Sequence, residues 1–547
     1  MIRNLLACGV AAALVLPAVA VAEDVLVRPP AGALQGVSER GLHVFKGVPY
    51  AAAPVGPNRW TPPQAPPRWE GVRPAKAFGP ACVQPTAKIA NLYSQDLGAT
   101  SEDCLTLNVW APAGVQRAPV LVWIHGGALA ASASKDPMYD GARLASRGGV
   151  VVVSINYRLG VFGYLAHPEL SAQSARGVSG NYGLLDQIEA LKWVQANIAA
   201  FGGDPANVTI AGESAGGLSV MYLMASPSAR GLFAKAIAQS AYMISTPELK
   251  QARFGAPAAE QSGLALGAAL HAPSITALRA LDAQTLSDAS AKAGFSPFAA
   301  VDGEILPAQL IEIFDQGRQA PAPILVGFNS GEIRSLRMLA PPEPGSPAVY
   351  EAAIRERYGD LAEAFLRLYP KSDMRESILA TTRDALYGWT AERLARSQTH
   401  RGQPAYLYLF DHGYPAADAL GLHGFHASEL PYLFGTRDAT PPLWPRIPKT
   451  AEESALSAAM IDYWTSFARD GRPSAAKAPE WPAFTPGGAY LRFADAPRVE
   501  HDLMPGMFVL NEAVVCRRHA VGNQAWNWNV GLAAPRLPAS STGCPQG

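Results

Sequence analysis

Short apolar runs separated by helical patterns dominate the first half of the chain. Residues 120–124, 150–155 and 208–211 are almost wholly apolar and rich in Val and Ile, as strands buried on both faces are. Before the last run, within residues 186–201, apolar side chains recur at helical spacing, at Ile188, Leu191, Val194, Ile198 and Phe201. Continuous apolar strands that alternate with amphipathic helices predict an α/β fold with a large, mostly parallel sheet covered by helices.

The second half of the chain continues this pattern less regularly. Beyond about residue 250 the chain is Ala-rich and helical in tendency, with Pro-rich breaks at 319–323 and 341–347 and a further apolar run at 324–326. Gly202, Gly203, Asp204 and Pro205 are expected to end the helix before the strand at 208–211. No internal repeat divides the chain, so residues 23–547 are predicted to form one domain.

Composition narrows the classes of partner. The chain has 547 residues, of which 49% are hydrophobic and 16% charged, so a large core can be buried. Lys and Arg together number 45, as do Asp and Glu, so no net field attracts nucleic acid or an acidic membrane. This balance favours a small or neutral substrate.

The first 22 residues are predicted to be a cleaved signal peptide. Arg3 precedes an apolar run at 5–19, and Ala20-Val21-Ala22 matches a small-x-small cleavage site. No later segment has about twenty uninterrupted apolar residues, so no stable membrane insertion is expected. The chain is therefore predicted to be secreted or periplasmic.

Export gives the remaining cysteines a structural meaning. Cleavage leaves Cys82, Cys104, Cys516 and Cys544, which allow three pairings. Pairing nearest neighbours closes two short loops, each worth about 3 kcal/mol in the chain-entropy model. A metal site is the alternative, but no C-x-x-C or H-x-x-x-H spacing supports it. We predict disulfides.

A serine flanked by glycines carries the candidate chemistry. Gly212-Glu213-Ser214-Ala215-Gly216 follows the run at 208–211, which fits a strand that turns sharply into a helix and raises the Ser214 hydroxyl above the sheet. A serine nucleophile needs a base, an orienting carboxylate and N–H donors for an oxyanion. Ala215 follows the serine, and His125-Gly126-Gly127-Ala128 ends the strand at 120–124, so the backbone N–H groups of Gly127, Ala128 and Ala215 are candidate donors.

The base and the carboxylate are less evident from the residues alone. His423 and His426 are three residues apart, so spacing cannot choose between them, and such a pair can also hint at a metal. Glu332 follows the apolar run at 324–326, yet a glutamate at a strand end is most often simply solvated.

Longer motifs resemble those of the type B carboxylesterases, the cholinesterase-like branch of the α/β-hydrolase fold. The resemblance covers nearly all of the mature chain, from Phe45 to past Phe434, and implies a sheet with long loop and helical insertions that form a gorge. The motifs are FKGVPY at 45–50, EDCLTLNV at 102–109, NYRLG at 156–160, GNYGLLDQ at 180–187 and FGGDP at 201–205.

The resemblance also implies the missing parts of a triad. The family's Gly-x-Asn-x-x-Glu pattern matches residues 327–332 and selects Glu332 as the acid. Its His-x-x-Glu-Leu-Pro-Tyr-x-Phe pattern selects His426 as the base, and Ser240 resembles a serine that supports the glutamate. The order Ser214, Glu332, His426 is the one expected of α/β-hydrolases. Cys104 lies in the family's Glu-Asp-Cys-Leu signature, whose cysteine forms a disulfide with an upstream cysteine. The resemblance therefore supports the Cys82–Cys104 pairing.

The predicted function is hydrolysis of small-molecule carboxylic esters through an acyl-enzyme, with no metal or organic cofactor. A non-catalytic binding module on the same fold and an amidase or peptidase with the same triad are the alternatives. Cholinesterases carry a tryptophan inside the first disulfide loop, whereas this chain has Tyr93 there and no tryptophan. Leu129 and Trp389 are candidates for an acyl pocket, although apolar residues more often pack in a core. Oligomeric state is not predicted.

Overall fold

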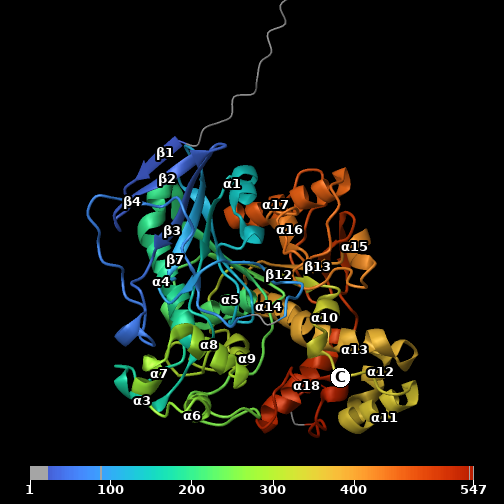
Figure 1. Ribbon diagram of the computed structural model, residues 1–547. Helices are drawn as coiled ribbons and strands as arrows, with labels where there is room; N and C mark the ends of the chain where they lie inside the picture. Colours follow the sequence, from blue (N-terminus) through green and yellow to red (C-terminus); the bar gives the residue numbers. More distant parts are fainter. Residues whose placement is uncertain (1–22, 87–88, 541–542, 546–547) are drawn as a thin grey trace, which may run out of the picture.

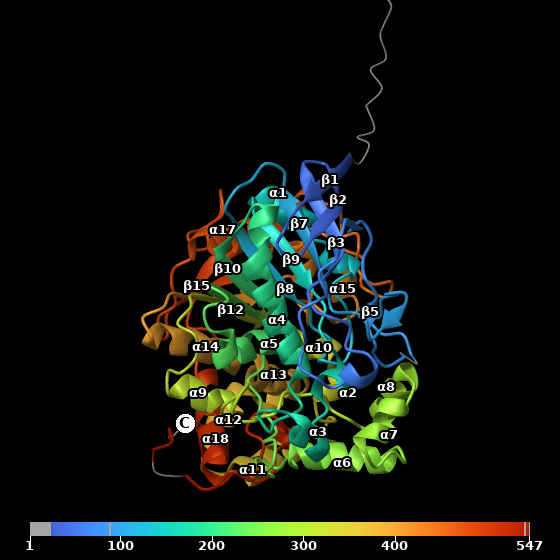
Figure 2. The ribbon, with the colours of Figure 1, turned by 90° about the vertical axis from the view of Figure 1, so that its left-hand side faces the viewer.

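One large sheet runs through the molecule and carries helices on both faces (Figures 1 and 2). The computed structural model describes residues 23–86, 89–540 and 543–545, so the predicted signal peptide lies outside the described residues. Thirteen strands form the sheet, in the order β1-β2-β3-β7-β9-β8-β10-β11-β12-β13-β14-β15, and β4 pairs with β2. The strands of the main sheet are β1 Glu23–Val27, β2 Ala33–Glu39, β3 Leu42–Pro49, β4 Val72–Pro74, β7 Thr106–Pro112, β8 Ala118–Ile124, β9 Val151–Ile155, β10 Gly203–Glu213, β11 Lys235–Gln239, β12 Ile324–Asn329, β13 Ala405–Phe410, β14 Ala489–Phe493 and β15 Pro497–His501. A small separate sheet pairs β5 Ala81–Cys82 with β6 Thr100–Ser101.

The helices connect these strands, and several of them form a cluster at one end of the molecule. In Figure 1, α11, α12, α13 and α18 gather at the end opposite β1 and β2. Their bounds are α1 Ala142–Gly148, α2 Gly160–Tyr164, α3 Pro168–Gln173, α4 Tyr182–Asn197, α5 Ala215–Ala225, α6 Ala259–Ala269, α7 Ile275–Ala280, α8 Ala283–Lys292, α9 Leu310–Asp315, α10 Glu332–Ser335, α11 Pro347–Tyr358, α12 Ala362–Leu368, α13 Met374–Arg383, α14 Trp389–His400, α15 Pro415–Asp418, α16 Leu430–Leu433, α17 Ala451–Asp470 and α18 Met507–Val521. A π-helical turn, Asp384–Gly388, joins α13 to α14.

Strand β8 shows how the sequence covers both faces of the sheet. All seven of its residues are buried, as the continuous apolar run predicted. Val120, Val122 and Ile124 pack in one core with side chains of α4, α5 and α14, and Leu121 and Trp123 pack in a second core with side chains of α1 and α17. This alternation follows from the two-residue period of a strand. Figure 2 looks onto the face that α4 and α5 cover.

The centre of the sheet is parallel, whereas its margins are antiparallel. Strands β9, β8, β10, β11, β12, β13 and β14 run parallel to one another, and β1, β2, β3, β7 and β15 add antiparallel pairs. Because parallel strands end at the same edge, the segments that follow β8, β10, β12 and β13 meet there. The candidate triad and the candidate oxyanion donors lie in these four segments.

The structure contains the two nearest-neighbour disulfides. Cys82 bonds to Cys104 across 22 residues, just before β7, and Cys516 in α18 bonds to Cys544 across 28 residues. The second bond fastens the segment after α18 back onto that helix. Both bonds lower the conformational entropy of the unfolded chain.

The predicted end of the helix is confirmed, and the strand after it is longer than the apolar run at 208–211. The helical pattern at 186–201 corresponds to α4 and a following 3-10 turn, Ile198–Phe201, and Gly202 ends it with φ 82°. Strand β10 begins directly afterwards at Gly203, so Gly203, Asp204 and Pro205 belong to the strand. Proline is tolerated there because the adjoining register of β10 with β8 is irregular between Gly203 and Val208. Among the described residues, no helix has the length and apolar character needed to cross a membrane.

Candidate active site

Ser214 occupies a strained turn between β10 and α5. Its backbone angles are φ 56° and ψ −119°, a region that side chains rarely adopt, and Ser214 is the N-cap residue of α5. A Cβ at Gly212 would lie 2.5 Å from the carbonyl carbon of Gly216, and a Cβ at Gly216 would lie 2.1 Å from the Ile124 carbonyl oxygen. The two glycines are therefore required by close packing, and the strain makes Ser214 a candidate functional position.

Two segments that carry candidate N–H donors lie beside this turn: Gly127 and Ala128 line the same cavity as Ser214, and Ala215 follows Ser214 in the chain. After β8, Gly127 and Ala128 have φ values of 96° and 56°, and the Gly127 carbonyl accepts hydrogen bonds from the N–H groups of Ala130 and Ala131. Among the described residues, nothing accepts a hydrogen bond from the N–H of Gly127 or of Ala128. Ala215 is the first residue of α5, where N–H groups have no partner within the helix. These donors suit an anionic oxygen.

Glu332 and His426 form a buried pair. His426 Nδ1 hydrogen-bonds to Glu332 Oε2, and the Glu332 side chain is fully buried. The other carboxylate oxygen accepts from Ser240 Oγ at 2.6 Å and from the Asn329 N–H at 2.8 Å. The carboxylate is thus fixed from three sides, and it holds the imidazole in one orientation. The predicted support from Ser240 is present.

The second nitrogen of His426 faces another carboxylate. His426 Nε2 lies 3.1 Å from Glu213 Oε1, in the residue just before Ser214. Between Ser214 and His426, both of them described residues, the structure has no hydrogen bond. Catalytic hydrogen bonds are often long or absent without substrate and form in the Michaelis complex.

Burial and charge act in opposite directions on these groups. Burial lowers the pKa of His426, but the nearby Glu213 and Glu332 outweigh it and raise that pKa above its usual value. Burial raises the pKa of Glu213, and it raises the pKa of Glu429 to about 7. Glu429 accepts from Gln239 at 2.9 Å and from Asn329 at 2.6 Å. Three carboxyl groups therefore surround one imidazole, a setting typical of functional sites.

A cavity of about 600 Å³ opens onto Ser214 and His426. Its volume is within the range usual for small-ligand sites. Gly127, Ala128 and Glu213 also line it. Much of the remaining wall is aromatic or aliphatic, including Tyr93, Tyr139, Tyr242, Phe295, Phe298, Leu386, Tyr387 and Trp528. This lining favours an uncharged organic ligand.

Three sequence candidates lie elsewhere. His423 is paired with Asp418 at 3.0 Å and with Asp411 at 3.1 Å, away from Ser214. The acyl-pocket hypothesis for Leu129 and Trp389 is wrong, because both are fully buried in the core and neither lines the cavity. Trp389 instead donates its indole N–H to Glu512 at 2.8 Å. Within the described part of the chain, no group of three His, Cys, Asp or Glu side chains is arranged to hold a metal ion.

Sequence reasoning missed the contact between Glu213 and His426. Glu213 lies inside the serine motif, but the motif alone does not indicate that its side chain turns toward the imidazole. It also missed the role of Tyr93, which lies in the cavity wall and contacts the segment of His426. Both contacts join segments that are far apart in sequence.

Comparisons with known proteins agree with this geometry. The sequence model described as "Carboxylesterase family" matches residues 23–505. Para-nitrobenzyl esterase of Bacillus subtilis is 38% identical over 460 residues, covering 83% of this chain and 91% of the relative. Fumonisin B1 esterase of Sphingopyxis macrogoltabida is 36% identical over 479 residues, covering 84% of this chain and 85% of the relative.

Solved structures of esterases share the fold. A carboxylesterase of Geobacillus stearothermophilus superposes with a TM-score of 0.76 at 34% identity, covering 89% of this chain and 99% of that one. A PNB esterase superposes with a TM-score of 0.75 at 36% identity, covering 87% and 97%. The chain is a carboxylic ester hydrolase with the α/β-hydrolase fold, and it belongs to the carboxylesterase family.

Proposed function

We propose that the protein hydrolyses small-molecule carboxylic esters with Ser214 as nucleophile, His426 as general base and Glu332 as orienting acid. The observation that carries the proposal is that His426, which is paired with the buried Glu332, lines the same cavity as a serine on a strained turn. Glu332 keeps the proton on Nδ1, which leaves Nε2 with a lone pair toward the cavity.

The reaction proceeds in two acyl-transfer steps. His426 Nε2 takes the proton of the Ser214 hydroxyl, and Ser214 Oγ attacks the ester carbonyl carbon. The carbonyl oxygen becomes an oxyanion that accepts hydrogen bonds from the N–H groups of Gly127, Ala128 and Ala215. His426 returns the proton to the leaving alcohol, and water repeats the sequence to release the acid and regenerate Ser214.

The proposal extends to the whole chain and to its destination. We infer that residues 23–547 form one catalytic domain, supported by the continuous sheet from β1 to β15. We also infer that the chain is exported, because two disulfides suit an oxidising compartment.

An active-site-directed reagent tests the nucleophile. A fluorophosphonate is expected to react with one serine per chain and to abolish ester turnover in proportion to the label. Peptide mass analysis should find the added mass on the peptide that contains Ser214. Heat-unfolded protein serves as the control and should not be labelled. Label on any other residue, with turnover lost, would contradict the assignment.

A matched pair of substrates separates the esterase from its alternatives. We expect rapid hydrolysis of an aryl acetate and at least about 100-fold slower hydrolysis of the corresponding anilide, because amide cleavage demands a better-placed general acid. Equal rates on both substrates would favour an amidase. A chain that hydrolyses neither would favour the binding module.

The pH profile should report the charge of Glu213. Neutral His426 is the active form, and the adjacent carboxylates raise its pKa, so the acid limb of kcat/KM should lie at higher pH than a free histidine would give. Glu213→Gln removes one of these charges and should move that limb to lower pH by about one unit. The measurement is kcat/KM against pH on an aryl ester.

Glu429→Gln is the matched control for this shift. Glu429 raises the pKa of His426 less than Glu213 does, so its removal should move the limb in the same direction by a smaller amount. A limb that stays in place in Glu213→Gln would show that Glu213 is uncharged in the working enzyme.

A further inference from the structure

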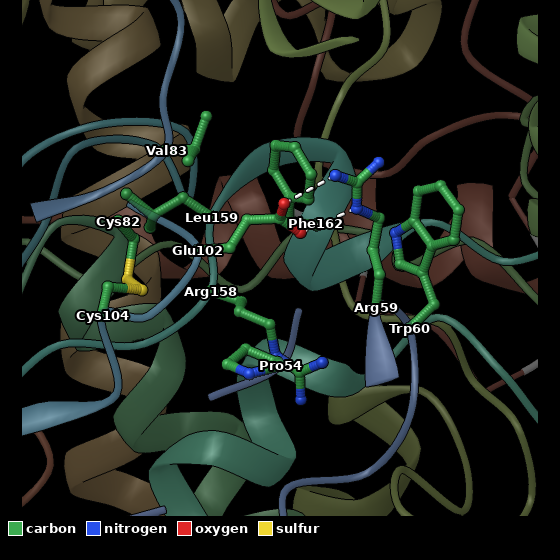
Figure 3. Close-up of a pocket in the computed structure, with 10 residues that line it drawn as sticks. All are labelled: Pro54, Arg59, Trp60, Cys82, Val83, Glu102, Cys104, Arg158, Leu159 and Phe162. Atoms are coloured by element: carbon green, nitrogen blue, oxygen red, sulfur yellow. Dashed lines mark hydrogen bonds and ion pairs between the residues drawn. A yellow bond between two sulfur atoms is a disulfide. The ribbon is translucent and has the colours of Figure 1, made fainter. Parts of the chain in front are cut away.

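The loop closed by the Cys82–Cys104 disulfide contributes Tyr93 and several neighbouring residues to the wall of the cavity. We call residues 82–104 the disulfide loop; residues 87–88 are outside the described part. Its base is held by the disulfide and by a bidentate pair, in which Arg59 Nε and Nη2 donate to the Glu102 oxygens at 2.7 and 2.6 Å (Figure 3). Both Arg59 and Glu102 are largely buried. The loop is therefore anchored firmly at its base.

A short turn in this loop directs Tyr93 toward His426. The Tyr93 N–H donates to the Asn91 side chain at 2.9 Å, and the Ser94 N–H donates to the Asn91 carbonyl at 3.0 Å. The Tyr93 ring lies edge-on to Trp444, with centroids 5.9 Å apart, and edge-on to His426, with centroids 6.2 Å apart. These contacts fix the plane of the ring.

The Tyr93 hydroxyl contacts the main chain that carries the imidazole. Its oxygen lies 3.1 Å from the His426 carbonyl oxygen and 2.7 Å from Ser335 Oγ. The Tyr93 hydroxyl is the donor in both contacts, so its one proton is shared between Ser335 Oγ and the His426 carbonyl oxygen. Ser335 in turn donates to the Glu332 carbonyl at 3.4 Å.

Ser335 closes the network on the other side. Its Oγ also accepts from the His426 N–H at 3.3 Å. Ser335 is the last residue of α10, the short helix that Glu332 begins. Both main-chain polar groups of His426 are thus held by side chains. The neighbouring Ala427 has φ 65° and His423 has φ 49°, so this segment is irregular and depends on such contacts.

We propose that Tyr93 is a positioning residue, which through its hydroxyl holds the main chain of His426 over Ser214. The disulfide loop is then part of the apparatus that sets the base, in addition to forming the cavity wall. This inference rests on the proposed function of His426. Other contacts also hold the segment, since the Gly331 N–H donates to the Gly424 carbonyl at 2.7 Å and Asn329 Nδ2 donates to the Phe425 carbonyl at 2.8 Å. The effect of losing the hydroxyl should therefore be partial.

Tyr93→Phe tests the inference, because it keeps the ring and removes only the hydroxyl. With a small aryl ester we expect kcat to fall by about tenfold to a hundredfold, as a small displacement of a catalytic group does, and KM to stay within about twofold. Ser335→Ala should give a similar fall. Because both act through one network, the double variant should be no slower than the slower single variant.

Tyr350→Phe is the matched control. Tyr350 in α11 also donates its hydroxyl to a backbone carbonyl, that of Tyr369, at 2.9 Å, but far from the cavity. This variant should lose some thermal stability and keep kcat within about twofold. It separates loss of a buried hydroxyl contact from loss of positioning.

Three results would overturn the role of Tyr93. They are an unchanged kcat in Tyr93→Phe, a raised KM at unchanged kcat, and fully additive losses in the double variant. Wild-type turnover, and its dependence on Ser214, are measured in the same assay and test the proposed function separately. An active wild type with an equally active Tyr93→Phe therefore rejects only this inference.

Discussion

Ser214→Ala is expected to lower kcat for an aryl ester by about 10³-fold to 10⁶-fold, the range seen when a serine nucleophile is removed. Residual turnover should come from the N–H groups of Gly127, Ala128 and Ala215, which remain in place. The fold should persist, because alanine meets the same backbone strain at φ 56° that serine does.

The measurement needs two readouts. Steady-state turnover gives the loss of activity, and thermal unfolding shows that the variant is folded. Ser240→Ala is a matched serine substitution in the same buried region and should cost far less, about tenfold, since Ser240 only donates to Glu332. Turnover by Ser214→Ala within tenfold of the wild type would remove Ser214 from the mechanism.

Glu332→Gln is expected to lower kcat by about 10⁴-fold, as loss of the triad carboxylate does elsewhere. The glutamine oxygen would keep the hydrogen bonds from Ser240 and the Asn329 N–H, so its amide nitrogen would face His426 Nδ1. An amide N–H forces Nδ1 to accept. The imidazole proton then moves to Nε2, where it blocks proton transfer from Ser214.

This mechanism makes a second, distinguishing claim. The fall in Glu332→Gln should appear mainly in kcat, and raising the pH should not restore it, because a wrong tautomer does not titrate away. The reaction of Ser214 with the fluorophosphonate should slow by a comparable factor in this variant. A variant that recovers wild-type turnover at high pH would show that Glu332 acts only by raising the pKa of His426.

Much of the fold could be predicted from the sequence, because buried strands require apolar runs and tight turns require glycine. The apolar runs became β8, β9, β10 and β12, and their alternation between two cores follows from strand geometry alone. The serine turn could be predicted for the same reason, because a side chain at Gly212 or Gly216 would clash with the backbone and only glycine fits there. Local steric requirements restrict the residue type at a position and are therefore visible in the sequence.

Contacts between segments that are distant in the chain could not be predicted in this way. The choice of His426 over His423 came from the family resemblance, because spacing could not show that His423 would face Asp411 and Asp418. The placement of Trp389 in the cavity failed for a related reason. Sequence shows that a side chain is apolar but does not show which apolar space it fills.

The spread of the site over four strands has a consequence for biosynthesis. The proposed donor loop, nucleophile, acid and base follow β8, β10, β12 and β13 in that order along the chain. A nascent chain that ends before β13 holds Ser214 and Glu332 but has no base. If these roles hold, ester hydrolysis is expected only once the sheet is nearly complete, and a chain truncated before β13 is expected to be inactive. Ester turnover is for that reason expected to indicate that the whole sheet has folded.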